Sequence, residues 1–308
     1  MSANVETMMY VRETPWHGLG TKVQEAPNSA EALKLAGLDW EVKQNDILLG
    51  DYGNVIEGFK ANVRSTDGAV LGIVSDRYKV VQNAEAFSFT DNLIGGDVRY
   101  ETAGSLYGGK KVWMLAKLPT ETVVGDEVTP YMCFTNAHDG TGSIQVCMTP
   151  IRVVCNNTLN LALNQAKRKW STKHIGNIEG KMHEAQMCLE YGAQYMESLA
   201  VEADKLANKH ISNDQIQEIL NELFPVKETD TDRVKNNVQK MKDEFMICYF
   251  MPDIEKFRNT AWGVVNAMSD MVTHTAPIRN TKNYKENNWG RIMAGNALID
   301  SVVASVSR

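Results

Sequence analysis

The sequence lacks any apolar run that approaches the ~20 consecutive residues needed to cross a bilayer, so it does not encode a helical membrane protein. Its first residues, MSANVETMMYV, lack the basic stretch followed by an apolar stretch that marks a secretory signal. We therefore expect a protein that stays in the cytoplasm. Hydrophobic residues at 43% and charged residues at 23% are near the ordinary averages, which favours a folded globular chain over a disordered one.

Residue patterns that signal metal or nucleophile chemistry are missing as well. The cysteines show none of the paired short spacings of a zinc site, the histidines form no HExxH motif, and no GxSxG sequence is present. The five cysteines are Cys133, Cys147, Cys155, Cys188 and Cys248. We expect reduced thiols, with those at 133, 147 and 155 buried in strands, and we expect no catalytic residue, metal or cofactor.

The chain also has no excess of positive charge. It carries 32 Lys and Arg against 38 Asp and Glu, a net charge of −6, which argues against coating duplex DNA by bulk attraction. Residues 1–165 carry the whole net charge of −6, and residues 166–308 are neutral. An anionic partner should therefore meet the second half of the chain or a few clustered cations on the first.

Turn residues at hairpin spacing dominate the first half. The three clearest hairpins are FKANVRSTDGAVLGIVS, YETAGSLYGGKKVWMLAKL and YMCFTNAHDGTGSIQVCM. Their turns fall at Asp67–Gly68, Gly108–Gly109 and Asp139–Gly140, because Asp-Gly and Gly-Gly supply the positive φ angles that short hairpin loops need. The first half is thus predicted to be an antiparallel sheet.

Helical periodicity takes over in the second half. Two helices, SAEALKLAGL and NAEAFSFTDNLIGG, interrupt the sheet, and the stretch TPIRVVCNNTLNLALNQAKRKW predicts a strand that leads into a helix after Asn156 or Asn157. From about residue 178 the chain is predicted to be helical, with a capping box at Ser212 and Gln215. We predict an α+β fold: a sheet-rich domain at 1–175 and a helical region at 176–308 that packs on it or mediates oligomerisation.

The segment WHGLGT, near the N-terminus, is interpreted as a structural clasp. It comprises Trp16, His17, Gly18 and Gly20 among its six residues. A phosphate-binding loop needs more glycine and a helix directly behind it, which the sequence does not provide here. We expect Trp16 to pack on the sheet and His17 to be hydrogen-bonded, since buried polar groups are satisfied.

Four motifs together resemble a known family. They are WHGLGT at 16–21, GIVSDRYKVVQNAEAF at 72–87, GGKKVWMLAKLP at 108–119 and TPIRVVCNNTLNLAL at 149–163. In this order they resemble the phage and plasmid-like family called domain of unknown function 932, in particular the subgroup with a Leu-Gly-Thr motif. The resemblance covers roughly residues 10–300. It implies a protein of mobile genetic elements in the host cytoplasm, and it brings no catalytic residues.

Cations beside aromatic residues form the best candidate site. The set is Arg77, Tyr78, Lys79, Lys110, Lys111, Trp113, Arg152, Lys167, Arg168, Lys169 and Trp170. Proteins that bind single strands combine cations for the phosphates with aromatic faces for the bases. The alternative for Lys167–Trp170, which we place at the end of a helix, is that its cations only complement the helix dipole.

A second basic and aromatic set lies in the polar stretch PIRNTKNYKENNWGR. It consists of Arg279, Lys282, Tyr284, Lys285, Trp289 and Arg291. We interpret this stretch as a solvated loop between two helices, because it is rich in Asn and has few apolar anchors.

The sequence favours a non-enzymatic protein of DNA metabolism or recombination that binds single-stranded DNA, with annealing by an oligomer as its role. The alternative is an interaction protein that inhibits or sequesters a host protein in counter-defence, for which an acidic first half with exposed strand edges is suited. A third alternative is a hydrolase or nucleotide-binding enzyme whose site is assembled from scattered residues such as His17, His138 and Asp139.

Overall fold

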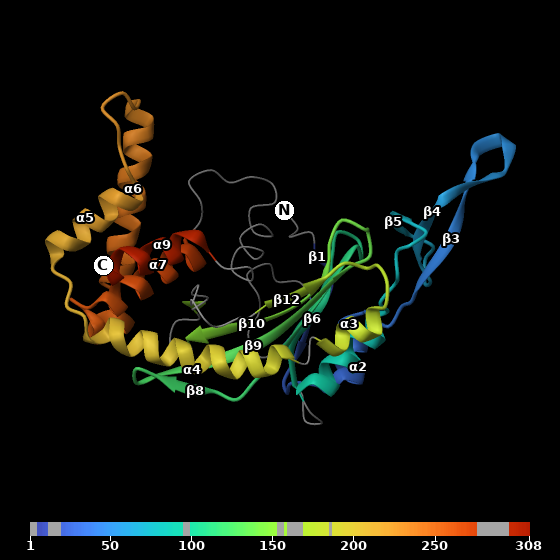
Figure 1. The fold of residues 1–308 in the computed structure, drawn as a ribbon, viewed down its shortest axis with the longest axis horizontal. Coiled ribbons are helices and arrows are strands. Elements are labelled where there is room, and N and C mark those ends of the chain that lie inside the picture. Colours follow the sequence, from blue (N-terminus) through green and yellow to red (C-terminus); the bar gives the residue numbers. More distant parts are fainter. Residues whose placement is uncertain are drawn as a thin grey trace. The chain divides into compact units, whose positions relative to one another are not determined.

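The chain folds into two compact units in the computed structural model (Figure 1). The structure describes residues 5–11, 20–94, 99–152, 157–158, 169–184, 187–275 and 296–308. The first unit, called the sheet unit, contains residues 1–118, 131–148 and 168–192, and the second, called the helical unit, contains 119–130, 149–167 and 193–308. The chain therefore passes between the units more than once instead of at one boundary near residue 175. Mostly antiparallel sheets and a helical C-terminal part confirm the α+β class.

The main sheet contains neighbouring strands in the order β10-β9-β7-β6-β1-β2, with β12 paired to β10. Their bounds are β1 Val5–Val11, β2 Thr21–Val23, β6 Arg99–Leu106, β7 Lys111–Lys117, β9 Asp126–Ala137, β10 Ile144–Arg152 and β12 Lys169–Thr172. The short strands β8 (Glu121–Val123) and β11 (Asn157–Thr158) belong to the helical unit. The pairing of β1 with β2 is parallel, which the prediction of an antiparallel sheet did not anticipate.

A second sheet of the same unit contains β3 (Val42–Leu49), β4 (Asn54–Arg64) and β5 (Val70–Ser75), with a 3₁₀ turn at Gly50–Tyr52 between β3 and β4. The three predicted hairpins are confirmed as β4–β5, β6–β7 and β9–β10. Gly68, Gly109 and Gly140 have φ angles of +72°, +83° and +77° in their turns, which explains why glycine occupies these positions.

Three short helices complete the sheet unit and contribute to its buried core. They are α1 (Ser29–Leu35), α2 (Asn83–Ile94) and α3 (Ile178–Glu184). The Asn28 side chain accepts from the Glu31 backbone while Glu31 accepts from the Asn28 backbone, so α1 begins with a capping box. Apolar side chains of α1, α2 and the strands, among them Trp40, Phe87 and Met114, form one buried cluster.

The helical unit is centred on α7 (Ala261–His274), in which ten of the fourteen residues are buried. The other elements are α4 (Met187–Asn208, which begins in the sheet unit), α5 (Asn213–Leu223), α6 (Asp232–Tyr249), a 3₁₀ helix at Pro252–Phe257 and α9 (Ala297–Ser307). The predicted capping box at Ser212 and Gln215 is confirmed. None of the helices in the described ranges is both long and apolar enough to span a membrane.

Lys169 and Trp170 lie in strand β12, so the prediction that they end a helix was wrong. Their backbone pairs with Cys147 and Val146 of β10, and Trp170 packs against the core cluster while Lys169 stays exposed. The exposed-and-covered alternation along this strand is a period of two, which four residues are too few to reveal in a sequence.

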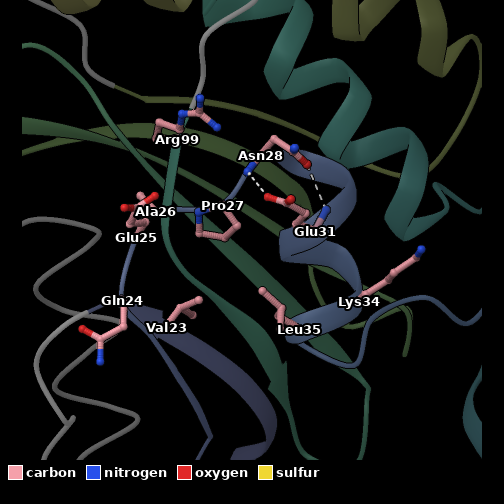
Figure 2. A pocket seen from close by; sticks show the side chains of 10 residues that line it. All are labelled: Val23, Gln24, Glu25, Ala26, Pro27, Asn28, Glu31, Lys34, Leu35 and Arg99. Carbon is pink, nitrogen blue, oxygen red and sulfur yellow. Dashed lines mark hydrogen bonds between the residues drawn. The ribbon is translucent and has the colours of Figure 1, made fainter.

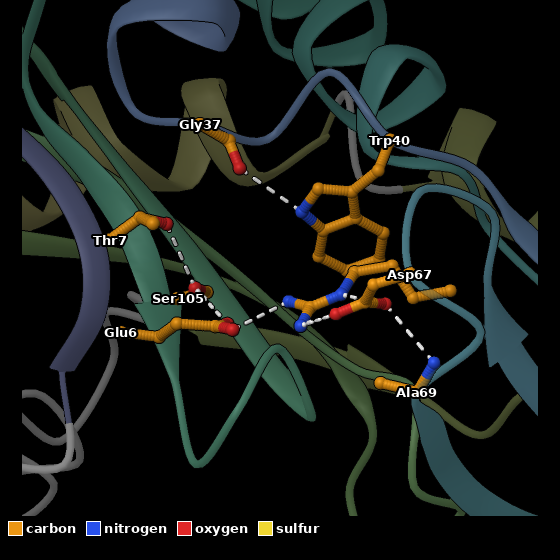
Figure 3. A network of polar contacts seen from close by, with 8 residues as sticks. Glu6, Thr7, Gly37, Trp40, Asp67, Ala69 and Ser105 are labelled. Carbon is orange, nitrogen blue, oxygen red and sulfur yellow. Dashed lines mark hydrogen bonds and ion pairs between the residues drawn. The ribbon is translucent and has the colours of Figure 1, made fainter.

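One network of polar contacts ties strand β1 to the β4–β5 hairpin (Figure 3). Arg64 donates two hydrogen bonds to the Asp67 carboxylate, at 2.9 and 2.6 Å, and a third to Glu6 at 2.7 Å. Its guanidinium also lies over the Trp40 ring, 5.6 Å from the centroid. The hydrogen bond from Arg64 lowers the pKa of Asp67 to about 2.

Gly20 is the part of the predicted clasp that the structure describes, since Trp16, His17 and Gly18 lie outside the described residues. Its φ is +105°, and a Cβ at this position would lie 2.5 Å from Met8 Cγ. We expect Gly20→Ala to lower the free energy of unfolding by about 1–3 kcal/mol, because the substitution adds both backbone strain and a clash with β1. Chemical denaturation measures the effect; Gly53→Ala, which has a positive φ but open space around it, isolates the strain alone.

Candidate nucleic-acid interface

Hydrogen bonds around two buried histidines, His138 and His174, hold together the segments that carry the predicted cations. His174 is 3% exposed, and its Nδ1 donates a hydrogen bond of 2.9 Å to the carbonyl oxygen of Lys79. In return the Lys79 amide donates to the His174 carbonyl at 2.8 Å, and Tyr78 forms an antiparallel bridge with Ile175. The segment 77–79 therefore lies directly beside the segment 173–175.

On the other side of Tyr78, a side-chain hydroxyl and a backbone amide make the connection. The Tyr78 hydroxyl donates to the Ala137 carbonyl at 2.6 Å, and the His138 amide donates to the Lys110 carbonyl at 2.7 Å. These bonds connect the segment 77–79 to the β9–β10 turn, and that turn to the β6–β7 turn. We call these hydrogen bonds the scaffold. It brings together four segments that are distant in the sequence, namely 77–79, 173–175, the β6–β7 turn and the β9–β10 turn.

The side chain of His138 is enclosed by polar and aromatic partners. Asn83 donates through its amide nitrogen to the carbonyls of Leu38 and Trp40, which turns its Oδ1 toward His138 Nε2 at 3.1 Å. Nε2 must therefore carry the proton and donate, since an amide oxygen only accepts. The Trp40 ring meets the imidazole edge-on at a centroid distance of 5.4 Å.

Both imidazoles are held in the neutral form. Burial lowers the pKa of His138 to about 3, and the neighbouring His174 lowers it further while Asp139 opposes the shift. The pKa of His174 is lowered by burial as well. The second ring nitrogens, His138 Nδ1 and His174 Nε2, have no hydrogen-bond partner among the described residues. The scaffold therefore holds its segments by neutral hydrogen bonds, not by charge.

Exposed cations lie along the four connected segments. We call Arg77, Lys79, Lys110, Lys111 and Lys173 the cationic surface, because all five side chains are exposed and their segments are joined by the hydrogen bonds above. None of the five forms an ion pair with another residue in the described part of the chain. Cations that are not neutralised internally remain able to meet phosphate groups.

Acidic residues in the same segments reduce this positive charge. Asp76 is exposed beside Arg77, and Asp139 accepts hydrogen bonds from the backbone amide and the hydroxyl of Thr141. The five cations still outnumber the two carboxylates, so the local charge is positive on a chain whose net charge is −6.

The predicted aromatic residues do not join this surface. Tyr78 is 6% exposed and stacks on His174 at a centroid distance of 4.4 Å, and Trp113 is 7% exposed. Trp170 packs against the core cluster, as described above. These rings support the scaffold from inside, so we leave them out of the interface that we propose.

Other predicted residues lie outside what the structure describes. Arg152 lies at the end of β10 and its side chain is not among the described ones, and the remaining members are Lys167, Arg168, Arg279, Lys282, Tyr284, Lys285, Trp289 and Arg291. Lys169 is described and exposed, at the end of β12 opposite to Lys173.

Two members of the interface were missed by the sequence reading. Lys173 follows a strand that was not predicted, and only the contact between His174 and Lys79 brings it to this surface. Tyr107, in the β6–β7 turn with φ of +56°, is partly exposed, and Lys111 Nζ lies 5.8 Å from its ring centroid. A cation beside a partly exposed ring is the combination sought at Tyr78 and Trp113.

An open hollow of about 950 Å³ lies elsewhere on the sheet unit (Figure 2). Its lining includes Asn28, Glu31, Lys34 and Arg99, so charges of both signs are present. Figure 2 shows that the side chains of Asn28 and Glu31 each accept a hydrogen bond from the other residue's backbone amide at the start of α1. Because these polar groups serve the helix cap, we do not take the hollow as the candidate site.

Buried thiols behave as predicted for core residues. Cys133 and Cys147 are 0% and 5% exposed, and neither forms a disulfide. A hydrogen bond of the Cys133 thiol with the neighbouring Cys147, together with burial, raises the pKa of Cys133, which keeps it protonated and unreactive. Cys155 lies outside the described residues.

Comparison with known proteins returns one match. A family model described as a domain of unknown function (DUF932) matches residues 70–291. No curated protein and no solved structure matches the chain. The matched region contains the whole cationic surface and both buried histidines, whereas β3 and β4 precede it.

Proposed function

Because the chain belongs to the DUF932 family, whose description assigns no activity, we propose a function from its own residues: the cationic surface binds the phosphate backbone of single-stranded nucleic acid. The observation that supports this proposal most directly is the set of five exposed cations on segments that are joined by hydrogen bonds of Tyr78, His174 and the backbone. An interaction of this kind reads no base sequence, since phosphate contacts fix position and supply affinity.

A single strand fits the surface better than a duplex does. The net charge of −6 weakens long-range attraction to any nucleic acid, so binding depends on close contacts with a few cations. A flexible single strand can follow cations on four separate segments, and its unpaired bases can reach a partly exposed ring such as Tyr107. We further propose that this binding serves the DNA metabolism of a mobile element, with strand annealing as the simplest role.

Salt dependence is the first test of this proposal. We expect a fluorescently labelled oligonucleotide to bind with an affinity that falls as salt rises, with a log–log slope of about −3.5 if the five cations meet phosphates, at ~0.7 for each contact. Fluorescence anisotropy at low and moderate salt measures the slope. Absence of salt-sensitive binding at micromolar protein would refute the proposal, and stable co-purification with a host protein would then favour the interaction protein instead.

Removing two neighbouring cations tests the location of the surface. We expect Lys79→Ala with Lys173→Ala to weaken binding at low salt by about tenfold and to reduce the slope by about 1.4, because two phosphate contacts are lost. The matched control is Lys227→Ala with Lys240→Ala, which removes two exposed cations from the helical unit. Equal weakening by both double variants would show that net charge, not this surface, governs binding.

A further inference from the structure

The β3–β4 hairpin extends well beyond the sheet to which it belongs. Strand β5 pairs only with residues 59–63 of β4, so residues 47–58 have no third strand beside them. Figure 1 shows this stretch, which we call the arm, reaching past the end of β5. A Cβ at Gly50, Gly53 or Gly58 would meet no atom within 4 Å, which confirms that the tip packs against nothing in the described chain.

Large apolar side chains cover the arm although nothing buries them. They are Leu48, Leu49, Tyr52, Val55 and Ile56, with Tyr52 80% and Leu48 58% exposed. A two-stranded hairpin alone is marginally stable in water, and exposed apolar patches of this kind mark interaction sites. The composition of the arm therefore requires a partner surface.

The outer face of the three-stranded sheet offers such a surface. Phe59, Val70 and Ile73 are 50%, 56% and 54% exposed on β4 and β5, whereas Leu71 and Val74 of β5 are buried on the other face. The register places Ile73 beside Ala61, and Val70 beside Val63. One side of this sheet thus packs on the core, and the other presents apolar side chains to solvent.

Charges on the two surfaces are complementary. The arm contains the exposed carboxylates of Asp51 and Glu57 and has no Lys or Arg between residues 47 and 58. Lys43 is exposed on β3, and the register places it beside Val63 and therefore in line with Val70 on the outer face. An acidic apolar arm fits a face that carries one cation and three apolar side chains.

We propose that two copies of this chain associate through these surfaces, with the arm of each copy laid across the outer face of the three-stranded sheet of the other. The contact is two-fold symmetric, because both surfaces are present on every copy. When the contact buries half or more of the exposed area of the eight apolar side chains, it removes on the order of 500 Å² of apolar surface per copy from water. That area equals the apolar share of a standard interface of about 800 Å² per partner.

The arm is a poor fit for nucleic acid. Its carboxylates would repel phosphate groups, and the apolar side chains offer no hydrogen bonds to them. The dimer does not depend on the proposed function, since the cationic surface comprises none of the residues at the contact.

Mass in solution, measured by light scattering or sedimentation across a range of protein concentrations, tests the proposal. We expect the natural chain to form a dimer at micromolar concentrations, and Leu48→Ser with Tyr52→Ser to be monomeric there with an unchanged melting temperature. The same variant should keep its affinity for an oligonucleotide if that binding exists, so the two proposals can fail separately. A monomeric natural chain, or a dimer that this variant leaves intact, would overturn the proposal.

Charge reversal tests the geometry of the contact. We expect Lys43→Glu to weaken the dimer by about tenfold, and Asp51→Lys with Glu57→Lys to do the same, because like charges then face each other at both contacts. A mixture of the two variants should regain dimers, since each contact in the mixed pair joins opposite charges. Failure of the mixture to exceed either variant alone would rule out this arrangement.

Discussion

His138→Ala is expected to lower the free energy of unfolding by about 3–5 kcal/mol, the cost of removing a large, fully buried ring from a packed core. The substitution leaves a cavity beside Trp40 and removes the hydrogen-bond partner of Asn83 Oδ1. Leaving that buried oxygen without a partner contributes about 1–3 kcal/mol of the loss. Chemical denaturation followed by circular dichroism measures the effect.

His210→Ala provides the matched control, because His210 is exposed in the helical unit. A surface substitution of this kind changes stability by about 0.5 kcal/mol or less. If the two alanine variants proved equally stable, the buried His138 ring would not stabilise the packing around Trp40 and Asn83.

Stability is expected to fall as the pH drops below about 6.5, where unfolded histidine begins to bind a proton. The folded pKa of His138 is about 3, so between these two values the unfolded chain holds a proton that the folded chain does not. Each such histidine lowers the free energy of unfolding by up to about 1.4 kcal/mol per pH unit, and His174 acts in the same direction. The contribution is fully present above pH 6.5 and is lost progressively toward pH 3.

Measurements between pH 7 and pH 5 isolate the effect of the two histidines on stability. The carboxylate of Asp67, whose pKa is lowered to about 2, begins to destabilise the fold only below about pH 4, where unfolded Asp gains a proton. His138→Gln places an amide nitrogen near the position of Nε2 but does not titrate. We expect the free energy of unfolding of this variant, measured by urea denaturation, to fall less steeply between pH 7 and pH 5 than that of the natural chain. An unchanged slope of this free energy against pH would mean that the proton is taken up at another residue.

The titrations of the two histidines can be removed together. His174→Asn keeps a donor near Nδ1 and is the conservative partner of His138→Gln, so the double variant removes both titrations while it retains both hydrogen bonds. The hydrogen bond from neutral His174 to Lys79 thus relates a property of the core to the position of a cation on the exterior surface.

Local sequence patterns predicted the hairpins and most helices well. Glycines 68, 109 and 140 mark the turns because their backbone needs positive φ, and the capping box at Ser212 involves residues only three positions apart. Strand β12 was missed because its pairing partner, β10, lies more than twenty residues away and its four residues carry no clear period.

Part of the candidate site was predicted from the sequence, and part was not. Arg77, Lys79, Lys110 and Lys111 were found from residue type alone, and their exposure follows from the cost of burying an unpaired charge. Tyr78 and Trp113 were expected at the surface, but an aromatic residue beside a cation in the sequence can face either side of a strand. Both rings face the core, because burying their large apolar area stabilises the folded chain.

The sequence by itself determined the α+β class, the turns, the caps and the cationic segments, because each depends on backbone preference or charge within a few neighbouring residues. Tertiary structure alone decided that Tyr78 stacks on His174 and bonds to Ala137, that Lys173 joins Lys79, and that the β3–β4 arm remains uncovered. These outcomes depend on contacts between residues tens of positions apart, and the free energy of such contacts comes from packing and desolvation that no local pattern records.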